Sequence, residues 1–153
     1  MKKFTLLLLF LLINFGGLAL GSWLMNNGPE TSWYQDLSKA PWTPPGWVFG
    51  AAWTTIMLCF SIYLSELFKN HYSLTALRFF IAQVILNVGW NYVFFNQYEI
   101  AGGLIVIILL TSLIFYFFFT FKKDVKNYSY LLLPYMIWLC IATSLNLYIL
   151  IHN

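Results

Sequence analysis

Charged residues are scarce in this sequence: Asp, Glu, Lys and Arg make up 8% of its 153 residues, whereas 61% are hydrophobic. A soluble globular domain carries about 25% charged residues, so this composition excludes an ordinary water-soluble protein. Crossing the hydrocarbon core of a bilayer as a helix takes roughly 20 apolar residues. Five stretches of about that length contain no charged residue, namely residues 4–25, 46–65, 79–98, 100–121 and 127–151.

These stretches also lack the alternation of polar and apolar residues that is typical of a transmembrane β-strand. A helix satisfies its backbone hydrogen bonds internally, which a bilayer requires. We therefore predict an all-α integral membrane protein, a single domain over residues 1–153 that forms a bundle of five transmembrane helices in the cell membrane.

The first stretch has an alternative interpretation. Two lysines before a Leu-rich run, with small residues at 19–21, are typical of a secretory signal peptide. We favour a transmembrane helix, because the apolar stretch continues through Met25 and is long enough to span. Gly17 and Gly21, four residues apart, also suit close helix packing.

Basic residues are absent from all five stretches, and their distribution between the connections predicts the orientation. With a cytoplasmic amino terminus, seven of the eight lie inside and only Lys39 lies outside. The seven are Lys2, Lys3, Lys69, Arg78, Lys122, Lys123 and Lys126. The net charge of +3 therefore reflects topology, and we expect the lipid bilayer, with anionic lipid at the inner face, as a partner rather than nucleic acid.

Metal-binding and catalytic patterns are missing as well. The two cysteines, Cys59 and Cys140, lie inside spans and suggest no disulfide, while His71 and His152 have no Cys or His at ligand spacing. We expect no metal and no resident cofactor. The spans have no ionisable residue near their middle, which argues against a proton relay, and the chain has no internal repeat of the kind many transporters show.

The longest connection, residues 26–45, is predicted to lie outside as a functional loop. We expect Thr43 to cap the second span, with Pro44 and Pro45 in its first turn. Pro134 stands inside the last span, where we expect it to bend the helix.

The seven tryptophans fall into two groups. Trp and Tyr normally form belts at the membrane surface, and this is the better interpretation for the four at positions 23, 33, 42 and 47. The other three, Trp53, Trp90 and Trp138, lie several residues from the ends of their spans. Because a helix rises about 1.5 Å per residue, we expect these three side chains to lie deep in the membrane. One face of the third span carries Gln83, Asn87, Trp90, Asn91 and Phe94, and one face of the last carries Tyr135, Trp138, Ala142, Leu145 and Asn146.

Two interpretations of the amides on these faces remain open. Buried amides often only hold membrane helices together, and each such hydrogen bond contributes on the order of 1 kcal/mol of stability. For Gln83 and Asn91 this structural interpretation and a functional role are equally well supported. Asn87 and Asn146 share a face with a deep tryptophan. Aromatic walls with a few amides are typical of a pocket for a planar apolar ligand.

The sequence resembles the TspO/MBR family, which comprises tryptophan-rich sensory proteins and translocator proteins, once called peripheral benzodiazepine receptors. Three blocks carry the resemblance over essentially the whole chain. They are residues 40–50, which read Ala-Pro-Trp-Thr-Pro-Pro-Gly-Trp-Val-Phe-Gly, with Trp53; Gln83, Asn87 and Trp90 with Phe94 and Phe95; and Pro134, Tyr135, Trp138, Ala142, Leu145 and Asn146. The first block, at the head of the second span, is the most specific.

The resemblance implies a homodimer that binds tetrapyrroles such as protoporphyrin IX, and synthetic benzodiazepine or isoquinoline carboxamide ligands, in a cavity closed by the first loop. We expect the cavity to involve Trp42, Pro44, Trp47, Phe49, Trp53, Asn87, Trp90, Phe94, Tyr135, Trp138, Ala142, Leu145 and Asn146. Sterol transport is disfavoured, because Leu147 and Ile151 occupy the aromatic and basic positions of the cholesterol pattern.

Three functions compete on this basis. A receptor or sensor that sequesters a porphyrin needs only the pocket. A light-dependent porphyrin oxidation, in which an indole such as Trp138 or Trp53 supplies an electron to the excited ligand, needs no acid-base constellation, and none is visible. A transporter of tetrapyrroles or other small hydrophobic molecules would need two access states.

Overall fold

The computed structural model describes residues 2–153, and this part of the chain is helical without any strand. Five long helices form the molecule: α1 (Lys3–Leu24), α3 (Gly46–Asn70), α4 (Leu74–Asn91), α5 (Ile100–Val125) and α6 (Leu133–His152). Four short elements join them: the 3₁₀ turn η1 (Gly28–Glu30), helix α2 (Ser32–Asp36), the π-helical segment η2 (Tyr92–Asn96) and the 3₁₀ helix η3 (Lys126–Leu132).

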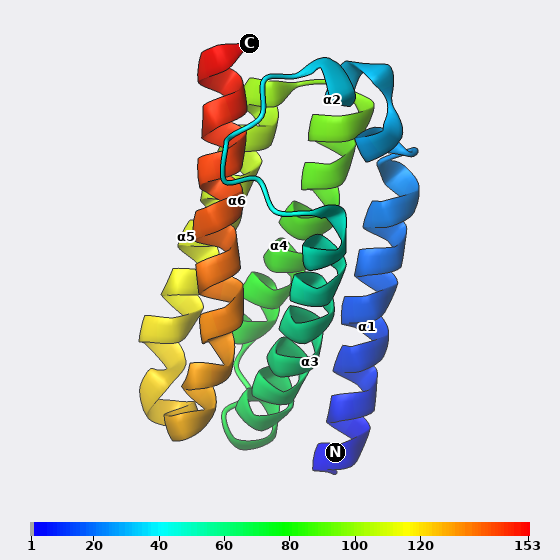
Figure 1. Cartoon of the computed structure of the whole chain (residues 1–153). Coiled ribbons are helices and arrows are strands. Elements are labelled where there is room, and N and C mark those ends of the chain that lie inside the picture. Colours follow the sequence, from blue (N-terminus) through cyan, green and yellow to red (C-terminus); the bar gives the residue numbers. More distant parts are fainter. Residues whose placement is uncertain (1) are drawn as a thin grey trace.

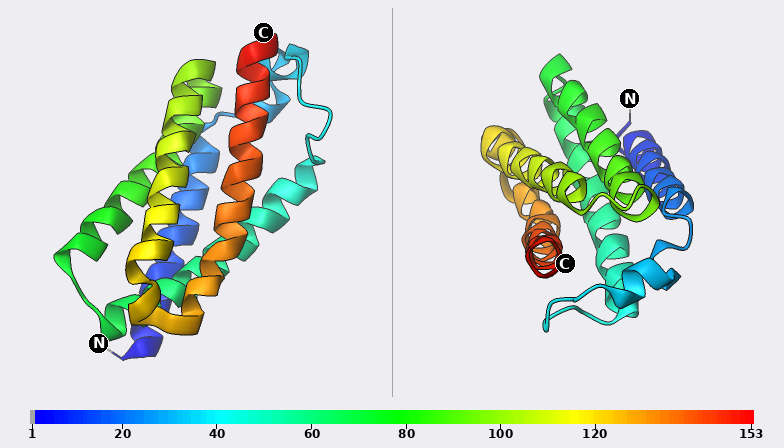
Figure 2. Two further views of the ribbon diagram at one scale, coloured as in Figure 1. Left: turned by 90° about the vertical axis from the view of Figure 1, so that its left-hand side faces the viewer. Right: turned by 90° about the horizontal axis from the view of Figure 1, so that it is seen from above.

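The long helices run up and down in sequence order and form one bundle (Figure 1). α1 packs against α3 and α4, and α5 packs against α4 and α6. The amino and carboxyl termini lie at opposite ends of the bundle, as an odd number of crossings requires (Figures 1 and 2). By length and composition four segments can cross a membrane, and the last, Ile100–His152, contains both α5 and α6. The chain is a multi-pass membrane protein.

Several helices extend beyond the predicted stretches. α3 continues to Asn70 rather than ending at 65, α4 begins at Leu74 rather than 79, and α5 runs on to Val125. The prediction followed uncharged residues only, whereas helical hydrogen bonding continues where the chain reaches the membrane surface and charge is tolerated. Ser73 begins α4 by accepting a hydrogen bond from the Ala76 N–H at 3.1 Å.

Two local predictions at prolines are wrong. Residues 127–132, expected to be membrane helix, belong to the 3₁₀ helix η3, so Pro134 lies in the first turn of α6, where its missing N–H costs nothing. It does not bend a helix interior. Thr43 does not cap α3: its hydroxyl donates to the Ala40 carbonyl at 2.7 Å, and α3 begins after Pro45 without a side-chain cap.

The main core lies between α3, α4, α5 and α6 and consists largely of aromatic and aliphatic side chains. Phe60, Tyr63 and Phe117 are completely buried there, with ring centroids 6.2 to 6.3 Å apart. α1 joins this core through Phe10 and through a buried hydrogen bond from the Asn14 amide to the Ser61 hydroxyl at 2.8 Å. Such polar contacts matter in a bilayer, because lipid is as apolar as the core and burial alone does not drive helices together.

Candidate functional site

The connection between α1 and α3 crosses the end of the bundle where the carboxyl terminus lies, and then returns to α3 (Figure 1). We call residues 25–45 the lid. Its helix α2 begins at Thr31, whose hydroxyl accepts from the Tyr34 N–H at 3.3 Å. The connection is thus a folded segment with its own capped helix.

Aromatic side chains attach the lid to the end of α4. Trp33 packs edge-on against Phe94 with centroids 5.7 Å apart, and Tyr34 packs against Phe95 at 5.2 Å. Gly28 lies so close to Phe95 that a Cβ atom there would come within 2.4 Å of the ring. From its position in the sequence we expected Trp33 in the membrane-surface belt, whereas its ring packs against Phe94 in the π-helical segment η2.

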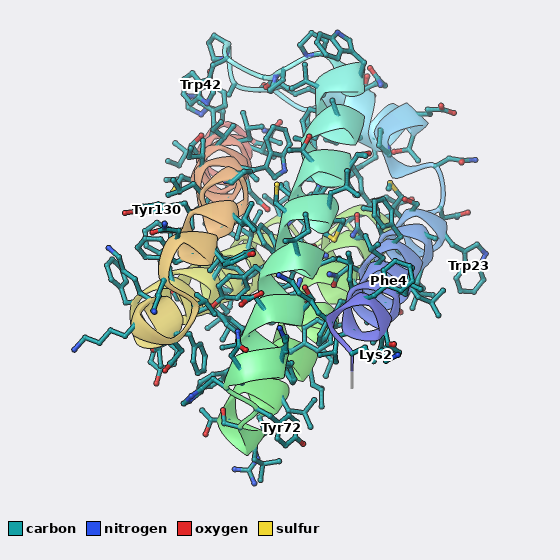
Figure 3. All side chains as sticks on the ribbon, turned by 90° about the horizontal axis from the view of Figure 1, so that it is seen from below. Lys2, Phe4, Trp23, Trp42, Tyr72 and Tyr130 are labelled. Carbon is teal, nitrogen blue, oxygen red and sulfur yellow. The ribbon has the colours of Figure 1, made fainter. Side chains whose placement is uncertain are left out.

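The lid is also attached to α6. The Trp42 indole N–H donates to the Ser144 hydroxyl at 3.1 Å, and its ring packs edge-on against Tyr148. The side-chain amide of Asn153 exchanges two hydrogen bonds with the Ser38 backbone, at 2.9 and 3.3 Å. Trp42 lies beside α6 at the edge of the molecule (Figure 3) and remains 55% exposed.

Rings from three helices meet beneath the lid, and we call them the aromatic cluster. Its members are Phe49, Trp53, Trp90, Phe94, Tyr135 and Trp138. Between α3 and α6, Phe49 lies edge-on to Trp138 with centroids 5.1 Å apart, and Trp53 lies edge-on to Tyr135 at 5.9 Å. Trp138 is buried inside the bundle, at 6% exposure.

Trp90, near the end of α4, and Phe94, in η2, stack with ring centroids 5.2 Å apart and an angle of 9° between the planes. The π-helical segment η2 begins between them, and π turns are frequent at functional sites. The Trp90 indole N–H donates to the Asn146 side-chain oxygen at 3.1 Å, and the Asn146 amide donates to the Ile100 carbonyl at 3.2 Å. Asn146 therefore joins α4, α5 and α6 in one polar contact.

Gly103 makes this junction possible. A Cβ atom at this position would lie 2.9 Å from the Phe94 ring and 3.2 Å from the Asn146 side-chain oxygen. In the sequence, Gly103 is simply the fourth residue of the predicted stretch 100–121. Its role as the contact surface for Phe94 and Asn146 depends on how α5 is rotated against its neighbours, which spacing within one helix does not reveal.

The amides on α4 point in two directions. Gln83 donates to the Tyr135 hydroxyl of α6 at 2.8 Å, and its side-chain oxygen is buried without a partner among the described residues. Asn87 and Gln83 both line a narrow crevice between α1 and α4, together with Asn14 and Gly17. Asn87 thus faces α1, while Trp90, one turn later, reaches α6.

The remaining predicted residues differ in exposure. Ala142 packs against the main core and Leu145 is buried beside Asn146. Pro44 is half-buried in the lid, whereas Trp47 is 75% exposed at the first turn of α3. Trp23 also points away from the bundle (Figure 3). Trp53, Trp90 and Trp138 all pack in the main core, whereas Trp47 lies outside it.

The chemistry of the aromatic cluster is that of a recognition surface. Its members offer ring faces and edges, a phenol and an indole N–H held by Asn146. Across residues 2–153 no group of three or more His, Cys, Asp or Glu residues is placed to hold a metal ion. The arrangement suits a planar apolar ligand fixed by a few polar contacts.

A family model described as the TspO/MBR family matches residues 8–152. The chain belongs to this family. Among TspO/MBR relatives, it is 33% identical over 130 residues to the tryptophan-rich protein TspO of Chlorobaculum tepidum, covering 82% of each chain. It is also 33% identical to the tryptophan-rich sensory protein of Cereibacter sphaeroides, over 74% of this chain and 72% of that protein. The human translocator protein is 26% identical, over 78% of this chain and 74% of that protein.

These matches confirm the resemblance inferred from the three sequence blocks. The names of these TspO/MBR relatives refer to tryptophan, sensing and translocation.

Proposed function

We propose that this TspO/MBR protein is a membrane receptor for tetrapyrroles such as protoporphyrin IX, bound beneath the lid against the aromatic cluster. One observation carries the proposal: aromatic rings from α3, α4 and α6 converge under a lid that is itself held by aromatic contacts. A porphyrin macrocycle is planar and apolar, and aromatic faces and edges bind such a ligand by stacking.

The cluster offers shape and stacking rather than charge, so the ligand's carboxylates should point out of the bundle. Lys39 is the basic residue of the lid. Its ammonium group donates to the Gln35 carbonyl at 2.9 Å and lies 4.8 Å from the centre of the Tyr34 ring. Burial raises the pKa of the Tyr34 phenol, so this ring is neutral at physiological pH. We propose that the porphyrin propionates lie near Lys39 at the water interface.

The same aromatic surface would accept synthetic benzodiazepine or isoquinoline carboxamide ligands, which are also aromatic and largely apolar. We further propose that the protein works as a homodimer in the cell membrane, with a cytoplasmic amino terminus.

The experiment is a titration of purified protein in detergent with protoporphyrin IX and with haem, following the quenching of tryptophan fluorescence. Metal-free protoporphyrin should bind at least as tightly as haem, because neither histidine lies in the aromatic cluster to ligate iron. Lys39→Ala should weaken both by up to about 1 kcal/mol. Clearly tighter haem binding with an axial-ligand spectrum that changes on mutation would contradict the proposal.

A light-dependent oxidation of the bound porphyrin is a second candidate, favoured by the buried indole of Trp138 and the half-buried indole of Trp53 at the cluster. Comparing porphyrin loss in light and dark separates this activity from simple binding. A transport function would instead appear as porphyrin flux across liposomes that contain the protein, without loss of the porphyrin.

A further inference from the structure

A cavity of about 460 Å³ lies at the end of the bundle opposite the lid, between the beginning of α1, the end of α3 and the beginning of α4. Its volume falls within the roughly 300–1,000 Å³ of small-ligand pockets. Its walls include Leu6, Leu9, Phe10, Phe68, Lys69 and Phe80. We call it the basal cavity. It shares no residue with the aromatic cluster.

The floor of the basal cavity is firmly built from aromatic rings. Phe10 packs against Phe68 with centroids 5.0 Å apart and edge-on against Phe80 at 5.2 Å. Phe10 and Phe80 are 3% and 5% exposed, so these rings form a fixed apolar surface. Leu9, in contrast, is 41% exposed on the outer side of α1. The cavity therefore opens sideways toward the lipid, and its walls suit a hydrocarbon chain.

The rim of the basal cavity carries one positive charge, that of Lys69. The neighbouring carboxylate, Glu66, is engaged elsewhere: it forms a salt bridge with Lys3 at 2.5 Å and accepts a hydrogen bond from Asn70. Within residues 2–153, Lys69 has no carboxylate within salt-bridge distance. Lys69 is exposed in the last turn of α3.

The whole end of the molecule around this rim is basic. It carries seven Lys and Arg residues and two carboxylates, Glu66 and Asp124, and Asp124 lies within 3.4 Å of His71. The opposite end carries one lysine and three carboxylates. A negative group is therefore attracted to the basal end.

We propose that the basal cavity is a binding site for one anionic phospholipid, with an acyl chain along Leu9, Phe10 and Phe80 and the phosphate at Lys69. A lipid without a charged headgroup would gain little binding free energy in the cavity, because the surrounding bilayer is as apolar as the cavity. Selectivity therefore comes from the charge at the rim, and each basic residue near an anionic surface strengthens binding roughly fivefold. The site differs from the proposed porphyrin site in position and in chemistry.

The test is native mass spectrometry of the purified protein with equimolar phosphatidylglycerol and phosphatidylcholine of identical acyl chains. We expect preferential retention of phosphatidylglycerol. Lys69→Gln should reduce this preference roughly fivefold, while Lys123→Gln, which removes the same charge from the same end but outside the cavity, should leave it nearly unchanged. Equal retention of the two lipids, or equal effects of the two variants, would overturn the proposal.

A second pair of variants tests the cavity itself. Leu9→Trp places an indole in the cavity mouth and should reduce retention of phosphatidylglycerol, whereas Leu8→Trp adds the same bulk at a 50% exposed position outside the cavity and should not. Helical content by circular dichroism checks that both variants fold. If Leu9→Trp instead lowers the proportion of dimer and leaves lipid retention intact, a second copy of the chain covers this surface and the lipid site is wrong.

Discussion

At the scale of single residues, the site is held by side chains that each contact more than one helix. Asn146 is the clearest case, because its oxygen accepts from Trp90 of α4 and its nitrogen donates to the Ile100 carbonyl of α5. Its side chain is 2% exposed, so neither partner can be replaced by water without movement of the helices. The sequence favoured a ligand-binding role for this amide, whereas the structure gives it a partner on two neighbouring helices.

Asn146→Ala should therefore lower stability by about 1–2 kcal/mol, because it leaves the Trp90 N–H and the Ile100 carbonyl unpaired. Thermal unfolding in detergent, followed by circular dichroism, measures the change. Asn91→Ala is the matched control, since the Asn91 amide donates only to the Asn87 carbonyl of its own helix at 3.2 Å. An equal loss in both variants would show that the three-helix contact contributes nothing beyond an ordinary helix hydrogen bond.

Trp138→Phe separates the two proposed roles of the deep indoles. Phenylalanine keeps an aromatic ring beside Phe49 but is much harder to oxidise than indole. Light-driven loss of protoporphyrin should fall more than protoporphyrin affinity, as measured by absorbance under illumination and by fluorescence titration in the dark. Trp23→Phe, at an exposed position, should change neither. An equal fall in both measurements would show that Trp138 only packs against the ligand and does not supply the electron.

At the scale of elements, the lid and the end of α4 form one unit. η2 widens the helix by a π turn where Phe94 and Phe95 receive the rings of Trp33 and Tyr34. The lid has a second attachment on α6 through Trp42 and Asn153. Opening of the site then requires release of the lid from α4, from α6 or from both, and such lid movements often limit ligand exchange.

Gly28→Ala should push the lid away from α4, because the added methyl group would come within 2.4 Å of the Phe95 ring. Dissociation of protoporphyrin should become faster, as measured by stopped-flow recovery of tryptophan fluorescence. Gly46→Ala is the control at the other end of the lid, where a Cβ atom meets nothing within 4 Å. Limited proteolysis without ligand gives an independent measure, and the lid should be cut faster only in Gly28→Ala. Identical dissociation rates for both variants would show that this contact does not hold the lid closed.

At the scale of the whole molecule, the distribution of charge along the bundle axis is the main asymmetry. The fold brings the seven basic residues named from the sequence to the end that contains the amino terminus, on helix ends and turns that the structure places together (Figure 1). Lys39 lies in the lid at the other end. The basic end is the one that the positive-inside rule assigns to the cytoplasm.

This assignment predicts the behaviour of topology reporters. An alkaline phosphatase fused after Asn153 should be active, as an extracytoplasmic enzyme, and the same enzyme inserted at residues 122–126 should be inactive. A green fluorescent protein at the same two positions should give the reverse pattern. Activity of the phosphatase at residues 122–126 and not after Asn153 would overturn the charge argument.

The sequence by itself determined the helical class, the five apolar stretches and the residues of the three blocks. These follow from composition and spacing, because a bilayer excludes charge and a helix places residues three and four apart on one face. For this reason the sequence could place Trp53, Trp90 and Trp138 on helices, several residues from the ends of the predicted stretches. The charged residues at helix ends were left out of the predicted stretches, because surface water tolerates them within a continuous helix.

The tertiary structure alone decided how these faces meet. It turned Asn87 toward α1 and Asn146 toward α4 and α5, placed Trp33 on Phe94, and made Gly103 the surface against which Phe94 packs. Spacing fixes a residue relative to its own helix only. The rotation of one helix against another depends on the fit of all the side chains between them, and that fit exists only in the assembled bundle.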